Sequence, residues 1–410
     1  MPPFPINQWV GRAMSGILKT KVRRIEVIVK ITERCNINCT YCYFFNMNND
    51  DYKRHPVHLP LTTAESIADF LRQGVIDLGA EAVTIDMHGG EPLMIKKDSF
   101  IAICDIFSSR LDPVCHLQFK VQTNGMLVDD EWISIFSNYN FSIGVSIDGP
   151  RDYNDLERVD HRGRGTYDGT AAGILKLQAA AAAQRIGRVG ALCVINPRFD
   201  ARLTYRHFVD DLGFTGMDFL LPLDDHDTFD PTLAEGYGHY LCDLFDEWAR
   251  DDNPAIQVRI LKNALIVLSQ GRAGIRRIDD EYHHGHQALT ISSNGDIGPD
   301  DTLRATSGNF FESGVNVANT PLIDFINRPM FQELTESRRN LPAKCRECCW
   351  KNACRGGRPI NRFSAKRRFD NPSVICDGLQ DFFSHVAAYL LRHGLSYERL
   401  QEALGLLEAA

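Results

Sequence analysis

Three cysteines near the N-terminus have a spacing that could bind a metal cluster. Cys35, Cys39 and Cys42 stand in the sequence CNINCTYC, directly after a short β-branched segment typical of a buried strand. Three thiolates on one loop can bind three irons of a 4Fe–4S cubane, which leaves the fourth iron open to a small molecule. A structural zinc site needs four ligands, so the fourth would have to come from elsewhere in the chain. The spacing alone leaves both alternatives open.

A second group of cysteines lies near the C-terminus. Four of them suit zinc or a fully ligated 4Fe–4S cluster: Cys345, Cys348, Cys354 and Cys376. The wide separation before the last of these is unlike a zinc ribbon and favours iron–sulfur. We interpret the adjacent Cys349 as a packing residue. The remaining cysteines are predicted to be core residues, because free cysteine packs as a small hydrophobe: Cys104, Cys115, Cys193 and Cys242.

Strand-like and helix-like segments alternate over about residues 24–222. The segments with strand composition are 25–32, 82–87, 116–122, 141–147, 189–195 and 216–221, and helical stretches such as 64–78 and 171–184 lie between them. This alternation predicts βαβ units and a parallel sheet, either open or a partial barrel. Further helices are predicted at 233–250, at 255–269 and in the tail from about 373, and Asn-Gly within 292–296 favours a hairpin turn.

Polar residues and glycines follow several of the predicted strands, where parallel sheets and barrels bind ligands. These candidates are Gly89, Gly90, Glu91, Gln122, Thr123, Asn124, Ser146 and Asp148. The two glycines would let a ligand approach the backbone, and Glu91 could bind a primary amine. Ser146 and Asp148 could form hydrogen bonds with ribose hydroxyls. Taken alone, Gly-Gly-Glu-Pro could equally be a simple loop.

The order of CNINCTYC, GGEP, QTNG and SIDGP resembles the radical S-adenosylmethionine (SAM) superfamily. The resemblance implies an α/β fold with a partial (β/α)6 TIM-like barrel. It also implies a 4Fe–4S cluster on Cys35, Cys39 and Cys42, with SAM on the open iron. The SAM contacts that it implies are Tyr41 and Leu192 at the adenine, Gly89, Gly90 and Glu91 at the amine, Ser146 and Asp148 at the ribose, Arg158 at the carboxylate, and Thr123 and Asn124 beside them.

The C-terminal cysteines resemble the last part of a SPASM domain, the auxiliary-cluster module of peptide-modifying radical enzymes. The full pattern has seven cysteines and two auxiliary clusters, but Asp300 and Arg358 stand here at two of the cysteine positions. We therefore expect the inner auxiliary cluster to be absent. The outer 4Fe–4S cluster keeps its four ligands, Cys345, Cys348, Cys354 and Cys376, and is expected to support the structure or to transfer electrons.

Two further segments have more than one interpretation. Residues 344–368 contain nine Lys or Arg and only Glu347 as an acid. We favour stabilisation of an anionic thiolate cluster by these cations, and a peptide-docking patch is the alternative. The stretch HHGH at 283–286 is more typical of a loop than of a metal site, since no carboxylate or cysteine accompanies it in pattern.

Asp301 is the candidate general base. In the SPASM-type sulfatase maturases, which this region resembles, an aspartate just after the hairpin cysteine acts as base, and Asp301 aligns with it. The alternative is an ordinary turn aspartate.

Composition limits the class of protein. The chain has 410 residues, 44 % apolar and 24 % charged, with a net charge of −8, so disorder and nucleic-acid binding through bulk positive charge are excluded. No secretory signal or membrane-spanning stretch is found, and we predict a cytoplasmic protein without a membrane partner.

We divide the chain into an N-terminal segment (1–23), a radical SAM partial barrel (24–230), a helical bridge (231–285), a SPASM/twitch-type auxiliary domain of α+β structure (286–378) and C-terminal helices (379–410).

The product is suggested by resemblance. CRGGRPINRF at 354–363 and NPSVIC at 371–376 look like the three-residue cyclophane-forming maturases of the Xye, Grr and Fxs types. These join an aromatic ring to the β-carbon of a residue two positions on, after a 5′-deoxyadenosyl radical has removed the β-hydrogen. Asp301 would take the ring proton, and the surplus electron could leave through the auxiliary cluster.

The implied partners are a ribosomally made precursor peptide and an external one-electron reductant of flavodoxin or ferredoxin type. Because no leader-binding domain precedes residue 24, we expect leader recognition to be unnecessary or to fall to the barrel or the C-terminal domain. The alternatives are another radical peptide modification, either thioether formation or formylglycine formation in a sulfatase, and a non-catalytic iron–sulfur or zinc scaffold.

Overall fold

One curved sheet forms the centre of the molecule. The computed structural model describes residues 22–47, 49–271 and 286–407. In these residues nine strands form a sheet of order β7-β6-β5-β4-β3-β2-β1-β8-β9, in which only the β8–β9 pair is antiparallel. The strands are β1 (Arg24–Thr32), β2 (Ala82–Gly89), β3 (His116–Thr123), β4 (Ser142–Ser146), β5 (Val189–Val194), β6 (Gly216–Leu220), β7 (Gln257–Val258), β8 (His286–Ile291) and β9 (Ile297–Gly298).

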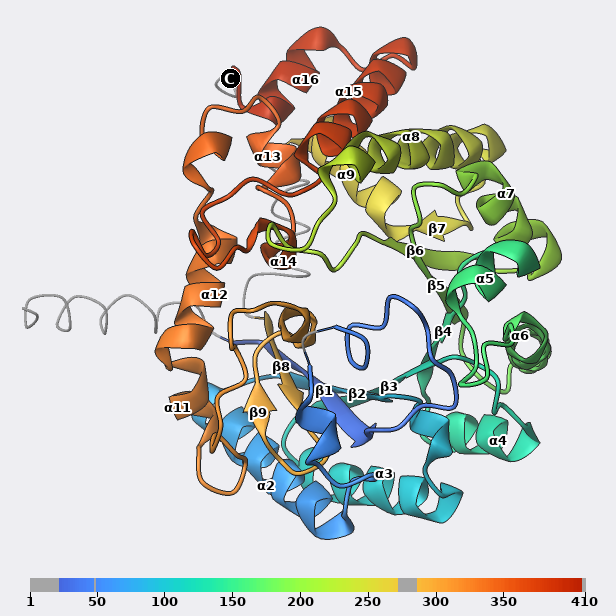
Figure 1. Cartoon of the computed structure of the whole chain (residues 1–410), viewed down its shortest axis with the longest axis vertical. Coiled ribbons are helices and arrows are strands. Elements are labelled where there is room, and N and C mark those ends of the chain that lie inside the picture. Colours follow the sequence, from blue (N-terminus) through green and yellow to red (C-terminus); the bar gives the residue numbers. More distant parts are fainter. Residues whose placement is uncertain (1–21, 48, 272–285, 408–410) are drawn as a thin grey trace, which may run out of the picture.

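The first six strands and the helices that follow them form a partial (β/α)6 barrel. Figure 1 shows the strands around a common interior, with helices along the outside. The helices of this part are α2 (Leu61–Leu78), α3 (Lys97–Leu111), α4 (Asp130–Asn138), α5 (Arg151–Glu157), α6 (Tyr167–Ala182), α7 (Ala201–Arg206) and α8 (Ala234–Asp251). This is the α/β barrel that the sequence predicts, and all six predicted strands are present with small shifts at their ends.

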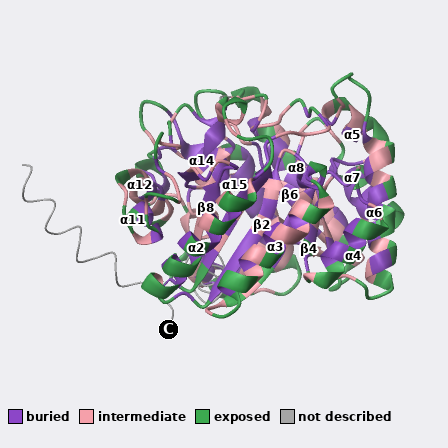
Figure 2. Ribbon diagram, turned by 90° about the horizontal axis from the view of Figure 1, so that it is seen from below, coloured by how far each residue is buried: buried purple, intermediate pink, exposed green. Residues whose placement is uncertain are grey.

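Strand β1 lies inside the sheet and is covered on both faces. Ile25, Val27, Val29 and Ile31 are fully buried. Because side chains alternate along a strand, Lys30 points to the opposite face from Val29 and Ile31, and it is also fully buried. Figure 2 shows the same pattern for the whole molecule, with buried strands at the centre and helices whose outer sides are exposed.

The C-terminal part packs on the open side of the barrel. Its helices are α9 (Arg259–Gln270), α11 (Leu322–Ile326), α12 (Pro329–Arg339), α13 (Lys351–Cys354), α14 (Pro359–Arg362), α15 (Cys376–Arg392) and α16 (Tyr397–Leu404), with a 3₁₀ helix, η6, at Asp301–Ala305. Helix α15 packs against α8 (Figure 1). A second, smaller apolar cluster around Phe310, Phe363 and Phe369 lies within this part.

Two predicted elements differ in the structure. The helix predicted at 255–269 begins only at Arg259, because Gln257 and Val258 pair with β6 as the short strand β7. The predicted hairpin is present, and its first strand, β8, pairs in parallel with β1.

The five-part division of the chain stays a prediction. The residues 283–285 of the HHGH stretch lie outside the described residues. No helix in the described part of the chain is long and apolar enough to cross a membrane.

Candidate functional site

The loop after β1 places three thiols on one cavity. Cys35, Cys39 and Cys42 all line a cavity of about 370 Å³ at the C-terminal ends of the barrel strands. Backbone hydrogen bonds fix the loop to the segment after α5: the Asn38 N–H donates to the Val159 carbonyl (2.7 Å) and the Thr40 N–H to the Glu157 carbonyl (2.9 Å). The cysteine positions are thus set by barrel backbone rather than by a free loop.

Burial disfavours a negative charge on the three thiols, although Arg158 favours it at Cys39 and at Cys42. Burial raises the pKa of Cys35 to about 12 and that of Cys39 to about 11, and it also raises the pKa of Cys42. Metal ligation requires thiolates, so a strongly cationic group would have to compensate them here. In the described residues, no group of three His, Cys, Asp or Glu side chains could hold a metal ion. In a cubane, each of three thiolates binds a different iron, and three cysteines on one loop suit that arrangement.

Gly89 and Gly90 allow close packing between the end of β2 and the cysteine loop. A Cβ atom on Gly89 would lie 2.0 Å from the Thr32 carbonyl oxygen, and one on Gly90 would lie 2.2 Å from that of Arg34. The Gly90 and Glu91 N–H groups donate to these same two carbonyls, each at 2.9 Å. The two glycines line the cavity. We expected glycine here because a ligand would approach the backbone, but the close neighbour that excludes a Cβ atom is the backbone just before Cys35.

Glu91 is a buried carboxylate that the protein itself orients. Its Oε1 accepts hydrogen bonds from Thr123 Oγ1 (2.7 Å) and the Leu93 N–H (3.0 Å), and its Oε2 accepts from the Asn124 N–H (2.7 Å). Burial raises the pKa of Glu91. Since each carboxylate oxygen can accept two hydrogen bonds, lone-pair capacity is left for an amine in the cavity.

Tyr41, Asp148 and Arg158 form a buried network on the cavity wall. The Tyr41 hydroxyl donates to Asp148 and accepts from Arg158 Nη1 at 2.7 Å. Arg158 Nη1 also lies 3.9 Å from Asp148 Oδ2. The buried Arg158 Nε has no hydrogen-bond partner among the described residues. This orphaned donor, next to Cys39, suits the carboxylate of an amino-acid ligand.

All ten residues that the resemblance assigns to SAM line this one cavity. They are Tyr41, Gly89, Gly90, Glu91, Thr123, Asn124, Ser146, Asp148, Arg158 and Leu192. Ser146 Oγ accepts a hydrogen bond from Gln122 Nε2 (2.7 Å), so the strand-end polar groups also orient one another. The sequence therefore predicted residues that the fold brings together, while their individual roles stay predictions.

Asp301 is buried beside the cavity but does not line it. Its Oδ2 lies 2.5 Å from Lys30 Nζ, and its Oδ1 accepts a hydrogen bond from Arg304 Nε at 3.1 Å. The Tyr43 hydroxyl also donates to Asp301. Burial alone would raise the pKa of Asp301, but the charges of Lys30 and Arg304 hold it well below its usual value. Asp301 is therefore an ionised carboxylate that contacts the cavity-lining Tyr43.

Lys30 and His88 are site residues that the sequence analysis missed. Lys30 Nζ lies 3.3 Å from His88 Nδ1 and 4.6 Å from the centre of the Phe44 ring. Burial lowers the pKa of His88 to about 4, and the Gly89 N–H donates to its Nδ1 at 2.8 Å, which favours the neutral ring with its proton on Nε2. The sequence features that could have indicated these two residues are a lysine within the apolar segment 27–31 and a histidine directly before Gly89.

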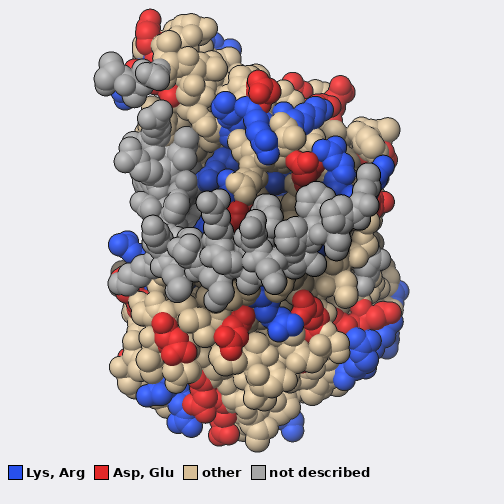
Figure 3. Space-filling view, turned by 90° about the vertical axis from the view of Figure 1, so that its left-hand side faces the viewer, with Lys and Arg blue, Asp and Glu red and all other residues tan. Residues whose placement is uncertain are grey.

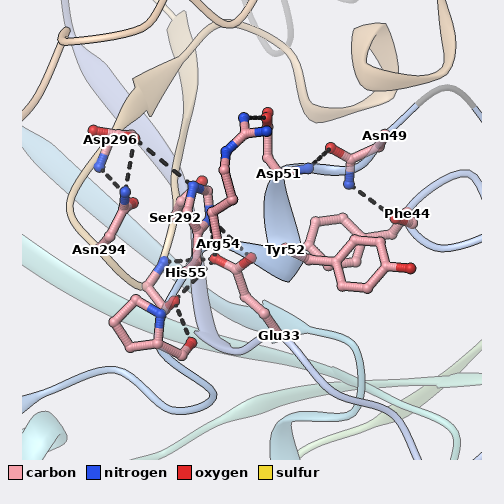
Figure 4. Close-up of polar contacts among 12 residues, drawn as sticks. Glu33, Phe44, Asn49, Asp51, Tyr52, Arg54, His55, Ser292, Asn294 and Asp296 are labelled. Carbon is pink, nitrogen blue, oxygen red and sulfur yellow. Dashed lines mark hydrogen bonds and ion pairs between the residues drawn. The ribbon is translucent and has the colours of Figure 1, made fainter.

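The start of the cysteine loop is also tied to the β8–β9 hairpin. Glu33 lies next to His55 and faces the turn that carries Ser292, Asn294 and Asp296 (Figure 4). The Glu33 carboxylate lies 2.9 Å from His55 Nδ1 and accepts the Ser293 N–H at 2.9 Å. Burial alone would raise the pKa of Glu33, but these two hydrogen bonds lower it. The hairpin thereby positions both the cysteine loop and Asp301, which follows β9.

The four C-terminal cysteines meet at a separate small cavity. Cys345, Cys348, Cys354 and Cys376 all line it. Burial raises the pKa of Cys354 to about 12. Cys349 is exposed, so our interpretation of it as a packing residue is wrong. Cys104 and Cys193 are buried as predicted, and Cys115 and Cys242 lie half-buried at the edge of the core.

Comparisons with known proteins identify the barrel. Residues 29–183 match the model of the radical SAM superfamily. The chain is 26 % identical to a serine-type anaerobic sulfatase-maturating enzyme of Bacteroides thetaiotaomicron, over 87 % of each protein. It is 22 % identical to a cysteine-type anaerobic sulfatase-maturating enzyme of Clostridium novyi, over 88 % of this chain and 95 % of the relative.

Solved structures show the same fold beyond the barrel. The structure of native anSMEcpe with bound AdoMet and Cp18Cys peptide has a TM-score of 0.72 at 18 % identity, and it covers 90 % of this chain and 98 % of that one. The structure of Streptococcus suis SuiB bound to precursor peptide SuiA has a TM-score of 0.58 at 17 % identity, over 88 % of this chain and 77 % of that one. At such low identity the likeness shows the fold alone.

Proposed function

We propose that this chain is a radical SAM peptide maturase that joins an aromatic side chain to the β-carbon of a nearby residue in a precursor peptide. Its cofactors are SAM and two 4Fe–4S clusters, one on Cys35, Cys39 and Cys42 and one on Cys345, Cys348, Cys354 and Cys376. When bound, SAM and the first cluster supply hydrogen-atom abstraction, and the second cluster supplies one-electron transfer. An external one-electron donor of flavodoxin or ferredoxin type completes the system.

The chain's own polar groups bind and orient the cofactor's methionine part. Arg158 Nε, which is buried without a partner among the described residues, donates to the carboxylate. Glu91, already oriented by Thr123 and the Asn124 N–H, accepts from the amine. The tight packing of Gly89 and Gly90 on the cysteine loop holds these groups and the three thiols in one rigid unit.

The composition of the cavity's outer wall is the observation that supports an aromatic side chain as one partner of the crosslink. Beyond the cysteines, the wall is mostly apolar and aromatic: Phe44, Phe45, Met47, Phe199, Leu220, Leu221, Pro222, Leu223, Leu233 and Tyr237. Such a wall favours an aromatic side chain by burial and by ring contacts. It also excludes water from the reacting carbons. A serine or cysteine side chain has little apolar surface for this wall to contact.

In this proposal, Tyr43 and Asp301 accept the proton that the aromatic ring loses after the crosslink forms. Closing the ring–Cβ bond requires the peptide to lose one hydrogen atom, one proton and one electron. The proton that leaves as aromaticity returns is strongly acidic, so a weak base is sufficient. Asp301 is ionised but lies behind Tyr43, whose hydroxyl donates to it. In this proposal the ring proton is transferred to Tyr43 as the phenolic proton moves to Asp301.

Formylglycine formation in a sulfatase is the second candidate. It is favoured by the sulfatase-maturating relatives, which match over 87 % and 88 % of this chain. Asp300 and Arg358 weigh against it, because they stand where the resemblance to the sulfatase-type pattern requires cysteines. Both residues face one arginine-lined cavity, and its described lining contains only Cys354 as a thiol.

The experiment offers reconstituted protein, SAM and a strong reductant to two sets of peptides. One set carries an aromatic residue two positions before a second residue, and the other carries a sulfatase-type serine or cysteine. Formation of 5′-deoxyadenosine without any peptide change would contradict both candidates. A crosslink and a serine-derived aldehyde both remove two hydrogens, so a hydrazide probe must separate them. A hydrazide-reactive product would establish formylglycine, whereas an unreactive product with a fragmentation-resistant tripeptide would support the crosslink.

A further inference from the structure

A second cavity, of about 540 Å³, lies between the barrel and the C-terminal helices. It is lined by residues of α9, α12, α13, α14 and α15, and Leu221 at the end of β6 belongs to the walls of both cavities. Figure 3 shows Lys and Arg side chains gathered on the upper half of this face of the molecule, around a hollow in which further blue atoms lie at depth. The cavity is not used by the function proposed above.

The described lining of this cavity is strongly cationic. It contains five arginines and one acidic residue: Arg259, Arg338, Arg355, Arg358, Arg362 and Asp300. Three of the arginines have evident structural partners. Arg362 donates to the carbonyls of Ser337, Asn340 and Phe369, Arg338 pairs with Asp300 at 2.9 Å, and Arg259 pairs with Asp218. These contacts account for their positions without a ligand.

Arg358 is different, because its charge has little compensation. In the described part of the chain, its guanidinium makes one long hydrogen bond, 3.4 Å from Nη1 to the Leu221 carbonyl. Burial lowers the pKa of Arg358, although the charge of Asp300 opposes this effect. A guanidinium has five N–H donors, so most of them are left to face the cavity. Arg358 is only half-buried, so an anion can reach its guanidinium from the cavity, and a poorly paired charge of this kind is stabilised when such an anion binds.

The shape and the remaining walls indicate what kind of anion fits. The volume is in the range of small-molecule sites and far exceeds one inorganic anion. Besides the arginines, the lining is largely apolar and includes Ile260, Val267, Phe382 and Phe383. A carboxylate on an apolar carrier matches both walls, because a planar guanidinium binds carboxylates in two parallel hydrogen bonds.

We propose that this cavity is a binding site for a carboxylate carried on an apolar peptide segment, with Arg358 as its main partner. The proposal rests on the proposed function in one respect, namely that the natural ligand is part of the peptide substrate. The shared Leu221 wall places such an anchor next to the reaction cavity. The carboxylate could be a peptide C-terminus or an acidic side chain, and the test separates these two sources.

The test measures binding to the full-length, cluster-reconstituted protein without SAM. The probes are Leu-Leu-Phe with a free C-terminus, the same peptide as its amide, and Leu-Glu-Phe amide, each with a fluorophore at its N-terminus. We expect at least one carboxylate probe to bind more tightly than Leu-Leu-Phe amide. Arg358→Gln should weaken that binding by about tenfold or more, since a charge-assisted pair is lost. Arg346→Gln removes an exposed charge from the same segment and should leave binding unchanged.

Thermal unfolding without probe distinguishes a binding role from a structural one. If the Arg358 charge is held for a ligand, Arg358→Gln should unfold at the same or a higher temperature than wild type. A lower melting temperature with unchanged probe affinity would overturn the proposal, as would equal affinity for the acid and amide probes. Displacement of the probe by equimolar inorganic phosphate would also overturn it. None of these readouts depends on SAM cleavage, so failure of the proposed function would appear separately, as missing 5′-deoxyadenosine.

Discussion

The Lys30–Asp301 pair shows how far a single residue's role depends on its surroundings. Both side chains are almost fully buried, with exposures of 0 % and 2 %. From its sequence position, Asp301 is a candidate general base. In the structure it lies between Lys30 and Arg304, is ionised before the reaction, and accepts the hydrogen bond of the Tyr43 hydroxyl. The group that faces the reaction cavity is therefore the phenol and not the carboxylate.

Tyr43→Phe tests this assignment with little loss of packing. The variant should still form 5′-deoxyadenosine in the presence of peptide, because Tyr43 acts after hydrogen abstraction. It should yield little crosslinked peptide, as measured by mass spectrometry of both products in one reaction. Crosslinking at the wild-type rate would show that the proton leaves by another route.

Asp301→Asn should give the same split between the two products, but at a cost in stability. The substitution leaves Lys30 and Arg304 without their shared anion, and breaking a buried pair costs about 3–5 kcal/mol. Denaturant unfolding measures this loss. Tyr43→Phe serves as the control, because it removes the hydrogen bonds of the Tyr43 hydroxyl with Asp301 and Lys30 but no charge.

Asp86 is expected to make the stability of the protein depend on pH, and its replacement should stabilise the protein, whereas Asp301→Asn should destabilise it. It shares the inner face of β2 with His88; burial raises its pKa to about 7, and its buried Oδ1 has no partner among the described residues. Because the folded-state pKa lies above the unfolded one, the wild type loses stability as pH rises from about 4 to about 7. Asp86→Asn, which has no charge, should become more stable than wild type over this range, by at least about 1 kcal/mol at pH 8. An equal difference at pH 4 and pH 8 would contradict the shift.

At the scale of elements, much of the structure was predictable because its signals are local. The six barrel strands follow from apolar β-branched segments, and the glycines and polar residues at strand ends follow from the rule that strand ends carry sites. Tyr41, Arg158 and Leu192 were assigned by family resemblance alone. The sequence analysis missed Lys30, His88 and Tyr43, because their role depends on contacts with a residue far along the chain. Asp301, for example, is 271 residues from Lys30. The short strand β7 was missed because only its pairing with β6 distinguishes it from a helix start.

Gly90 links two elements and allows a test of the cysteine loop. In Gly90→Ala, the Cβ would lie 2.2 Å from the Arg34 carbonyl oxygen, so the backbone just before Cys35 must move. We expect reconstitution to yield about four irons instead of about eight, since one cubane is lost. Gly187→Ala is the matched control, because its Cβ meets nothing within 4 Å. Full iron content in Gly90→Ala would mean that the loop tolerates the shift.

At the scale of the whole molecule, the two cysteine groups have different mechanical roles. The first group lies on one loop that barrel backbone already fixes. The second group connects the segment 345–354 to Cys376, the first residue of α15, and α15 packs along α8 of the barrel. Metal binding at the second group, as we propose it, would therefore tie distant parts of the chain together, and its free energy would add to that of folding.

This difference predicts opposite phenotypes for the loss of each cluster. Cys35→Ala, Cys39→Ala and Cys42→Ala together should abolish 5′-deoxyadenosine formation and leave the melting temperature nearly unchanged. Cys345→Ala with Cys348→Ala should lower the melting temperature and expose the C-terminal helices to protease, while slow cleavage of SAM continues, because the reaction cavity is intact. Each variant should retain about four irons. Cys349→Ala, which removes an exposed thiol from the same segment, is the control and should match wild type in all four measurements: 5′-deoxyadenosine formation, melting temperature, protease sensitivity and iron content. If Cys345→Ala with Cys348→Ala left the melting temperature unchanged, α15 would be held by its contacts with α8 alone. Electron transfer would then be the remaining role of the auxiliary cluster.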